Sequence, residues 1–389
     1  IDISFEGNNI DMGRLLINSD IDIQGLVSGR GTVRGSMDNP QFNAYVESNA
    51  LALNGEALSD IHGQLYADKS VVNLQNFTFA ENTGGRYVAS GGMRLDGTKS
   101  LFGALNVENG GVNNLLTLLD KKNEHLDGRL NGSVELGGTY DNPSVHVQGT
   151  IDDVSIDKTV VGDASIDASL ANRKFDVKTL KLPVNDGLIA MGGTMDLDGT
   201  ANMQVALKNV DIKPFLPLIG KDINATGNVT GVLNMTGETK NPKVELSAAI
   251  EDGSYNGIAI DQGFALATMQ DGVIQIQRIQ GTKGGYKLAA YGKIPLAALY
   301  TSGHLAADDK KAMDVTIDFN EADMAVIPLV TKSVKEATGA LKGTVHITGT
   351  VDQPEAYGAV SVRNGSMKLA AVNNEITDIR KCLCIHDCI

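Results

Sequence analysis

The chain has 389 residues, enough for two or three ordinary domains, and its 33 Lys+Arg against 47 Asp+Glu give a formal net charge of −14. Because binding to nucleic-acid phosphates needs clustered cations, this balance argues against a nucleic-acid partner. With 42% hydrophobic and 21% charged residues the chain does not belong to the disordered class, and no apolar run approaches the ~20 residues of a membrane-spanning helix.

The first recognisable feature along the chain is a glycine phrase. It runs from Gly25-Leu-Val-Ser-Gly29 through Gly35 to Asn39-Pro40, with glycines 15, 11 and 5 residues before the proline. The same phrase, in the same register, occupies residues 25–40, 128–143, 227–242 and 339–354. Four copies spaced by about 100 residues predict internal repetition.

Two further phrases repeat with the same period. Residues 85–97 match 187–199, with a looser copy at 287–296, and residues 60–65 find a counterpart at 378–383. The repeats predict one continuous body over 1–389, with approximate units 1–105, 106–208, 209–318 and 319–389, the last incomplete. Since the chain begins Ile1-Asp2-Ile3 without Met, we expect it to be part of a longer protein.

The segments between the glycines alternate apolar and polar residues, as in Val134-Glu135-Leu136. Strict alternation is typical of a β-strand with one apolar face. Pairs such as Asp96-Gly97 and Asn364-Gly365 favour tight hairpin turns, and each Asn-Pro or Gln-Pro belongs in a turn or at a strand's first residue. The pattern therefore predicts an all-β fold, an elongated meander of antiparallel hairpins.

One short segment in each copy departs from the period of two. These segments show a helical stripe of apolar residues and lie at 11–16, 112–119, 214–219 and 324–330, the first being the weakest. We expect them to form one or two helical turns outside the sheet ladder, across one open side.

The apolar face of an alternating sheet must be covered. A second sheet, closure into a solenoid, or curling into a trough that holds apolar ligand would each do this. The candidate lining is mostly aliphatic, which suits acyl chains. It comprises Val134, Leu136, Val145, Val147, Leu233, Met235, Val244, Leu246, Val345 and Ile347.

The glycine phrase, preceded by a turn such as Pro214-Phe-Leu-Pro-Leu-Ile219, resembles the repeat of the TamB and AsmA-like proteins of diderm bacteria. The resemblance covers nearly the whole chain. It implies a long curled antiparallel sheet, a β-taco, with an apolar groove and no catalytic residues. It also implies a periplasmic protein whose parent is anchored in the inner membrane, a role in phospholipid transport to the outer membrane, and, for some members, an outer-membrane partner of the Omp85 type.

Single residues give little sign of chemistry. Cys382, Cys384 and Cys388, with His386, could be a metal cluster, but in the aligned repeat they occupy ordinary strand and turn positions, so we predict no metal site. The role of the cysteines stays open. The six histidines are scattered, and we expect His146 and His346 at solvated strand positions. No catalytic triad or phosphate-binding loop stands out, so we expect neither catalysis nor a cofactor.

The leading hypothesis is a non-catalytic periplasmic conduit for phospholipid acyl chains between inner and outer membrane. A further role in outer-membrane protein assembly belongs to the same hypothesis. The alternative is a structural surface protein, either a β-solenoid adhesin or a passenger stalk. Solenoid adhesins usually have shorter repeats, which favours the conduit. A glycan-processing enzyme would need a set of carboxylates and aromatic residues that the sequence does not display.

Overall fold

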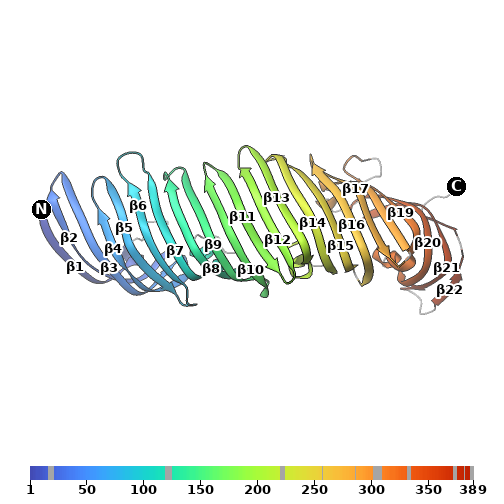
Figure 1. The fold of residues 1–389 in the computed structure, drawn as a ribbon, viewed down its shortest axis with the longest axis horizontal. Coiled ribbons are helices and arrows are strands. Elements are labelled where there is room, and N and C mark those ends of the chain that lie inside the picture. The colour runs from blue at the N-terminus through green and yellow to red at the C-terminus, as the bar shows by residue number, and fades with distance from the viewer. Residues whose placement is uncertain are drawn as a thin grey trace. The chain divides into compact units, whose positions relative to one another are not determined.

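The computed structural model describes residues 1–15, 22–118, 125–219, 224–255, 257–284, 286–300, 309–330, 334–370, 375–380 and 382–385. The chain divides into two compact units, Ile1–Asn185 with Ala190–Asp198, and Asp186–Ile189 with Gly199–Ile389. Each unit is a curled antiparallel sheet in which strands consecutive in the chain pair with one another (Figure 1). The all-β antiparallel class is therefore confirmed, whereas the division into four copies stays a prediction.

The first unit contains the strands up to β11, and β12 (Gly187–Asp196) is divided between the units. Its elements are β1 (Asp2–Asp11), α1 (Met12–Leu15), β2 (Ile23–Ser36), β3 (Asn39–Leu53), β4 (Glu56–Ala67), β5 (Val71–Glu81), β6 (Arg86–Arg94), β7 (Leu101–Gly111), α2 (Val112–Leu118), β8 (Leu126–Gly138), β9 (Pro143–Ile156), β10 (Thr159–Ala171) and β11 (Lys174–Val184).

The second unit continues in the same manner and ends on two short strands, β22 and β23, that both pair with β21. Its elements are β13 (Thr200–Asp211), η1 (Lys213–Phe215), α3 (Leu216–Ile219), β14 (Ala225–Glu238), β15 (Lys243–Tyr255), β16 (Ile258–Gln270), β17 (Val273–Lys283), β18 (Tyr286–Pro295), α4 (Leu296–Tyr300), β19 (Met313–Asp323), η2 (Met324–Val326), α5 (Ile327–Val330), β20 (Val334–Gly349), β21 (Pro354–Leu369), β22 (Glu375–Ile379) and β23 (Cys382–Ile385).

Each glycine phrase lies on one hairpin: β2–β3, β8–β9, β14–β15 and β20–β21. The glycine five residues before the proline has a positive φ in every copy, a conformation that L side chains rarely adopt. These angles are 114° at Gly35, 74° at Gly138, 88° at Gly237 and 85° at Gly349. The hairpin turn thus explains the fixed spacing from glycine to proline, and β9 and β21 begin at that proline, as expected.

The strands that precede four of the short helices, β1, β7, β13 and β19, each contain a β-bulge. The bulge residues Asn9, Asn109 and Asn209 have φ values of 54°, 54° and 49°. Their backbone N–H groups donate to polar side chains on the next strand, at 3.1, 2.7 and 3.0 Å. Those acceptors are Ser28, Asn131 and Thr230, which directly precede the second glycine of the phrase.

The four helical segments predicted from the sequence are confirmed as α1, α2, η1–α3 and η2–α5. Three of them begin after an aspartate whose carboxylate accepts a backbone N–H of the first turn: Asp11 from Arg14, Asp211 from Lys213, and Asp323 from Ala325. Such a side chain satisfies one of the unpaired N–H groups at a helix start. Helix α4, which follows Pro295, was not predicted.

Candidate functional site

The second unit carries two neighbouring apolar rows on one face of its sheet. Residues that pair directly across antiparallel strands share a face, and so do residues two apart on one strand. One row follows the pairs Val205, Leu233, Leu246, Ala267 and Ile276 across β13–β17. The other follows Met203, Met235, Val244, Met269, Ile274 and Ile294 across β13–β18. The four candidates of β14 and β15 therefore lie together.

The first unit has rows of the same kind. One crosses all of its strands from β1 to β11, through Phe5, Gly31, Ala44, Leu65, Leu74, Gly91, Gly103, Leu136, Val145, Leu170 and Phe175. A second row contains Leu105, Val134, Val147, Ala168 and Val177. The four candidates of β8 and β9 are thus neighbours on one apolar face.

These rows keep contact with solvent. Leu136 is 40% exposed and Leu233 is 36% exposed, and the first row of the first unit also exposes Phe5, Leu74 and Phe175 by 36%, 39% and 37%. Most of the other candidates are half-buried, namely Val134, Val145, Val147, Met235, Val244, Leu246 and Ile347. A contiguous, partly exposed set of large apolar side chains is typical of a binding surface.

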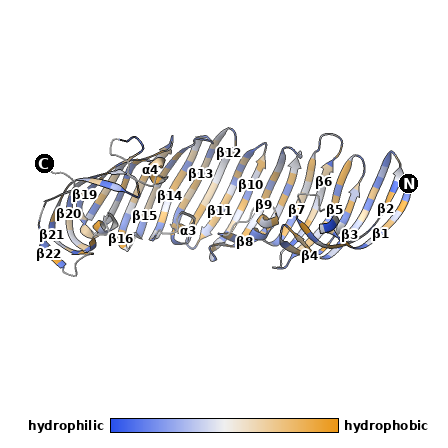
Figure 2. Cartoon of the chain, turned by 180° about the vertical axis from the view of Figure 1, so that it is seen from behind, coloured by the Kyte–Doolittle hydropathy of each residue, from blue (hydrophilic) through white to orange (hydrophobic). Residues whose placement is uncertain are grey.

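The opposite face is mainly polar, as the alternation predicts; orange and blue positions follow one another along the strands in Figure 2. His146 contacts Asp167 at 2.8 Å and Glu135 at 3.6 Å, and all three belong to this face. His346 lies 3.5 Å from Asp314. Both histidines are therefore on partly solvated strand positions, as expected, although each has a carboxylate partner.

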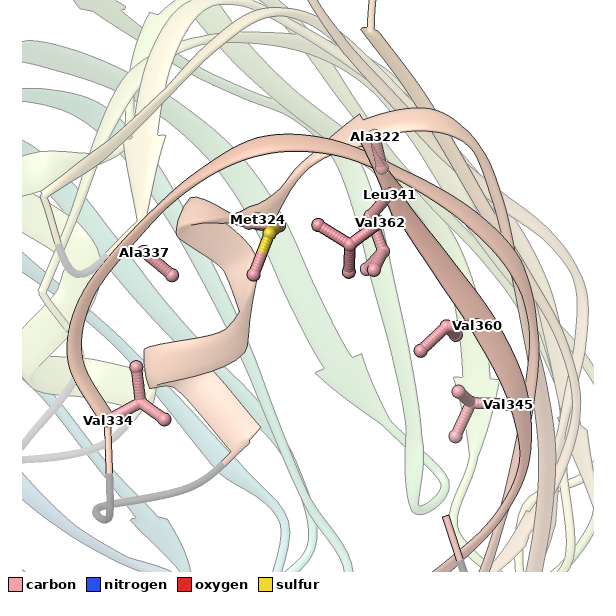
Figure 3. Packing of buried hydrophobic residues seen from close by; sticks show 8 residues of the cluster. All are labelled: Ala322, Met324, Val334, Ala337, Leu341, Val345, Val360 and Val362. Atoms are coloured by element: carbon pink, nitrogen blue, oxygen red, sulfur yellow. The ribbon is translucent and has the colours of Figure 1, made fainter. Parts of the chain in front are cut away.

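Val345 occupies a different environment from the other candidates. It is 7% exposed and belongs to a cluster with Met324, Leu341 and Val362, against which Ile347 also packs. Figure 3 shows this cluster on the inner side of the curved strands, around the helical segment η2–α5. Because Val345 pairs with Ile317 on β19, the apolar rows of the second unit reach this inner side. Here the helical segment covers them.

In the first unit, α2 covers part of the apolar face. Val112 and Leu115 of α2 pack against a cluster formed by Tyr87, Val107 and Leu130. The rings of Phe79 and Tyr87 stack with centroids 4.7 Å apart. Helix α2 thus acts as a partial cover, and residues of the apolar rows such as Leu136 stay partly exposed.

A buried carboxylate, Glu81 at the end of β5, holds α2 in place. Its Oε1 accepts the backbone N–H of Gly111 at 2.7 Å and an N–H of Arg129 at 3.3 Å. Its Oε2 accepts from the Asn114 amide at 2.6 Å and the Tyr87 hydroxyl at 3.1 Å. In this copy Gly111 stands where the other three copies have the capping aspartate. The first-turn N–H of Asn113 donates instead to Asp127 at 3.5 Å, and Glu81 binds the N–H of Gly111 from another strand.

Burial is the main cause that raises the pKa of Tyr87, with the Glu81 carboxylate as the next. The pKa of Glu56 is also raised, by burial first and by Glu81 second. Glu81, Glu56 and the phenol of Tyr87 thus influence one another electrostatically, and Arg129, 3.3 Å from Glu81, supplies the positive charge. Sequence analysis missed this group because Gly111 and Arg129 are 30 and 48 residues from Glu81 in the chain.

The three cysteines lie at the C-terminal end of the sequence. Cys388 and His386 lie outside the described residues, and Cys382 and Cys384 are described only through the backbone of β23, which pairs with β21. In the part of the chain that is described, no group of three or more His, Cys, Asp or Glu side chains is placed to hold a metal ion.

The described helices are all too short or too polar to cross a membrane. Comparison with family models, with curated proteins and with solved structures gives no match for this chain. The candidate site is consequently defined by its own geometry, two neighbouring apolar rows in each unit with short helices over part of them.

Proposed function

We propose that this chain is a non-catalytic lipid-transfer protein whose apolar sheet face holds phospholipid acyl chains. The observation that carries the proposal is the row of apolar residues across successive strands, glycines on three of them, that remains partly exposed at Phe5, Leu74, Leu136 and Phe175. A row that follows the strand order offers a lipid many similar contacts and no single strong one. Such contacts favour sliding over storage.

The energetic argument concerns the cost of moving a lipid through water. Each methylene transferred to water forfeits about 0.8 kcal/mol, so an acyl chain of ~16 carbons faces roughly 10 kcal/mol or more. A continuous apolar surface removes most of that barrier. The aliphatic composition of the rows suits flexible acyl chains, because it offers little ring stacking or hydrogen bonding that would select one ligand.

The resemblance of the glycine phrase to TamB and AsmA-like proteins supplies the cellular part of the proposal. On that basis the chain is a β-taco of ~100-residue repeats in the periplasm. Its parent protein is anchored in the inner membrane, lipid passes toward the outer membrane, and an Omp85-type outer-membrane protein is the partner. The two strands of each glycine phrase, with equivalent turn glycines in all four copies, support the repeat.

The test compares the two faces of one strand. A photo-crosslinking residue at Val134 should form lipid adducts in cells, and the same residue at the neighbouring Glu135, on the polar face, should not. The two positions are adjacent on one strand and differ in face, and circular dichroism of both variants checks that they fold equally. Adducts at neither position, or equally at both, would contradict the proposal.

A second test changes the apolar row itself. Leu233→Asp should lower the transfer of a fluorescent phospholipid between vesicles, because the new carboxylate must be desolvated beside an acyl chain. Asn234→Asp places the same charge one residue away on the other face and is the matched control. Circular dichroism checks that both variants fold. Equal transfer by both variants would favour the alternative, a structural surface protein, which the covered cluster around Met324 also suits.

A further inference from the structure

We propose that phospholipid enters and leaves the apolar face of the first unit over one long side of its sheet, with the head group in water beside Tyr140. The inference rests on the proposed lipid transfer and adds a route to it. The side in question, the turn side, is formed by the turns at 37–38, 68–70, 95–100, 139–142 and 172–173. The opposite side, the helix side, is formed by α2 and the turns at 54–55, 82–85 and 157–158.

The exposure of apolar side chains differs between the two sides. On β8, Leu136 at the turn side is 40% exposed, whereas Leu130, on the same face toward the helix side, is 7% exposed. On β11, Phe175 at the turn side is 37% exposed and Val184 at the helix side is 1% exposed. An acyl chain therefore reaches apolar surface from the turn side, while the surface toward the helix side is already covered by protein.

Helix α2 closes the helix side. Val112 and Leu115 of α2 pack against the cluster that contains Leu130. At the other end of the helix, the side-chain amide of Asn54 donates to the Leu118 carbonyl at 2.9 Å. Because Asn54 lies in the turn between β3 and β4, whereas α2 leads into β8, the helix extends along the helix side past the ends of the strands between them. An acyl chain crossing here would have to displace it.

The turns themselves differ in the same sense. Three turns of the turn side carry a large exposed apolar or aromatic side chain, with Met37 82%, Leu95 43% and Tyr140 66% exposed. The turns of the helix side hold only glycine and polar residues, at 54–55, 82–85 and 157–158. The accessible apolar surface thus continues from Leu136 to the edge of the sheet on the turn side alone.

Tyr140 is suited to the boundary between hydrocarbon and water. Its backbone N–H donates to the Lys99 carbonyl at 3.0 Å, and the Lys99 ammonium lies 5.9 Å from the centroid of its ring. Tyrosine and lysine both combine an apolar body with a polar end, and both are favoured where an apolar region meets water. A lipid whose acyl chains contact Leu136 would therefore have its head group near this pair.

The second unit does not leave the corresponding side open throughout. Helix α4 lies on the side of the glycine-phrase turns, where Ala298 is completely buried. The Ala298 carbonyl accepts the backbone N–H of Val351 at 3.2 Å. Val351 precedes the proline of its phrase by three residues, as Tyr140 does in the first unit. The route is therefore assigned to the first unit.

The experiment uses the whole chain and phosphatidylcholine vesicles that contain a trace of phosphatidylcholine with a fluorescent acyl chain. A photo-crosslinking residue at Tyr140 or at Lys158 probes exposed turns at the two ends of β9. The same residue at Val134, on the apolar face, reports binding itself. We expect fluorescent adducts at Val134 and Tyr140, and only background labelling at Lys158.

Two charge variants test whether the turn side is used during transfer. Tyr140→Asp should lower the rate of phospholipid transfer between vesicles about tenfold, because the new carboxylate must be desolvated beside each passing acyl chain. Asn82→Asp adds the same charge to an exposed turn of the helix side and should transfer lipid as the wild type does. Circular dichroism checks that both variants fold.

The outcomes separate the route from lipid binding. Adducts at Val134 together with equal labelling of Tyr140 and Lys158, or with none at Tyr140, would overturn the route and leave lipid binding intact. Equal transfer rates of Tyr140→Asp and Asn82→Asp would also overturn the route. Absence of adducts at Val134 would overturn lipid binding and the route together.

Discussion

Two regions of the molecule solve the same structural problem by different means. In each, a short helix covers part of an apolar sheet face. Segment η2–α5 is held by an apolar cluster in which Met324 is completely buried and Leu341 nearly so. Helix α2 is held by the buried carboxylate of Glu81, which accepts hydrogen bonds from Gly111, Asn114, Tyr87 and Arg129. The comparison shows that the position of a cover is fixed more strictly than the interactions that hold it.

The difference predicts how the packing of each helical segment responds to substitution. Apolar contacts are non-directional and lose energy gradually as surface is exposed. The hydrogen bonds to a buried carboxylate depend on single atoms. Removing one of those atoms leaves a partner unpaired in the interior, which is costly. We therefore expect the η2–α5 region to be sensitive to side-chain volume, and the α2 region to be sensitive to single polar atoms.

The largest expected effect is that of Leu341→Ala. The lost side chain leaves a cavity in the cluster with Met324 and Val362, and such substitutions cost about 2–5 kcal/mol. Leu136 belongs to an apolar row and is 40% exposed, so Leu136→Ala should cost clearly less. Urea denaturation of both variants measures the difference. Equal midpoints would mean that the cluster is no better packed than the open rows.

Glu81→Gln should destabilise the first unit by about 1–3 kcal/mol, although it preserves volume. All four partners donate to Glu81, and the amide nitrogen of glutamine cannot accept a hydrogen bond. At least one of the four partners is therefore left without an acceptor. Glu135→Gln, with its carboxylate 68% exposed, is the control and should change the midpoint little. Hydrogen exchange should quicken in α2 and not in the second unit. An unchanged α2 would show that its apolar contacts alone hold it.

The sequence predicts which residues share a face, and it does not predict which of them are covered. Val134, Leu233 and Val345 each follow the second glycine of a phrase by two residues, yet Val345 alone is buried. The cause is the cluster around Met324, whose members come from four separate elements. Alternation and turn glycines are local signals, whereas covering depends on contacts between distant segments.

The same limit applies to the polar contacts. The aspartates before three helices, Asp11, Asp211 and Asp323, are a local capping signal that the sequence does carry and that could have been recognised. Glu81 leaves no such signal, because the Gly111 N–H that it accepts is 30 residues away in the chain. Helix α4 was missed because Leu296–Tyr300 follows directly on a strand without a break in apolar composition.

Asp323→Ala should cost about 1 kcal/mol, since the carboxylate accepts the Ala325 N–H at 3.0 Å at the start of η2. Asp323→Asn keeps an acceptor at the same place and should retain most of the stability. The pair of variants separates capping from the ion pair that Lys283 makes with Asp323 at 3.9 Å. If Asn is as damaging as Ala, charge and not capping is the source of the effect.

The smallest effect concerns pH and belongs to the α2 region. Burial and the Glu81 carboxylate raise the pKa of Tyr87 above its usual value of 10.0, so the folded state keeps the phenol proton after the unfolded state has begun to release it. The contribution of Tyr87 to stability is therefore complete below pH 10 and declines as the pH rises beyond it. Tyr87→Phe has no such proton to lose.

Urea midpoints of wild type and Tyr87→Phe at pH 8 to 11 test this argument. Below pH 10 the variant should be less stable, because Glu81 loses the hydroxyl that donates to it at 3.1 Å. Above pH 10 the gap should narrow, since only the wild type has the Tyr87 phenol that ionises in its unfolded chain. Tyr140→Phe, at a residue 66% exposed, should follow the wild type at every pH. A constant gap between wild type and Tyr87→Phe would mean that the Tyr87 phenol ionises as readily in the folded protein as in water.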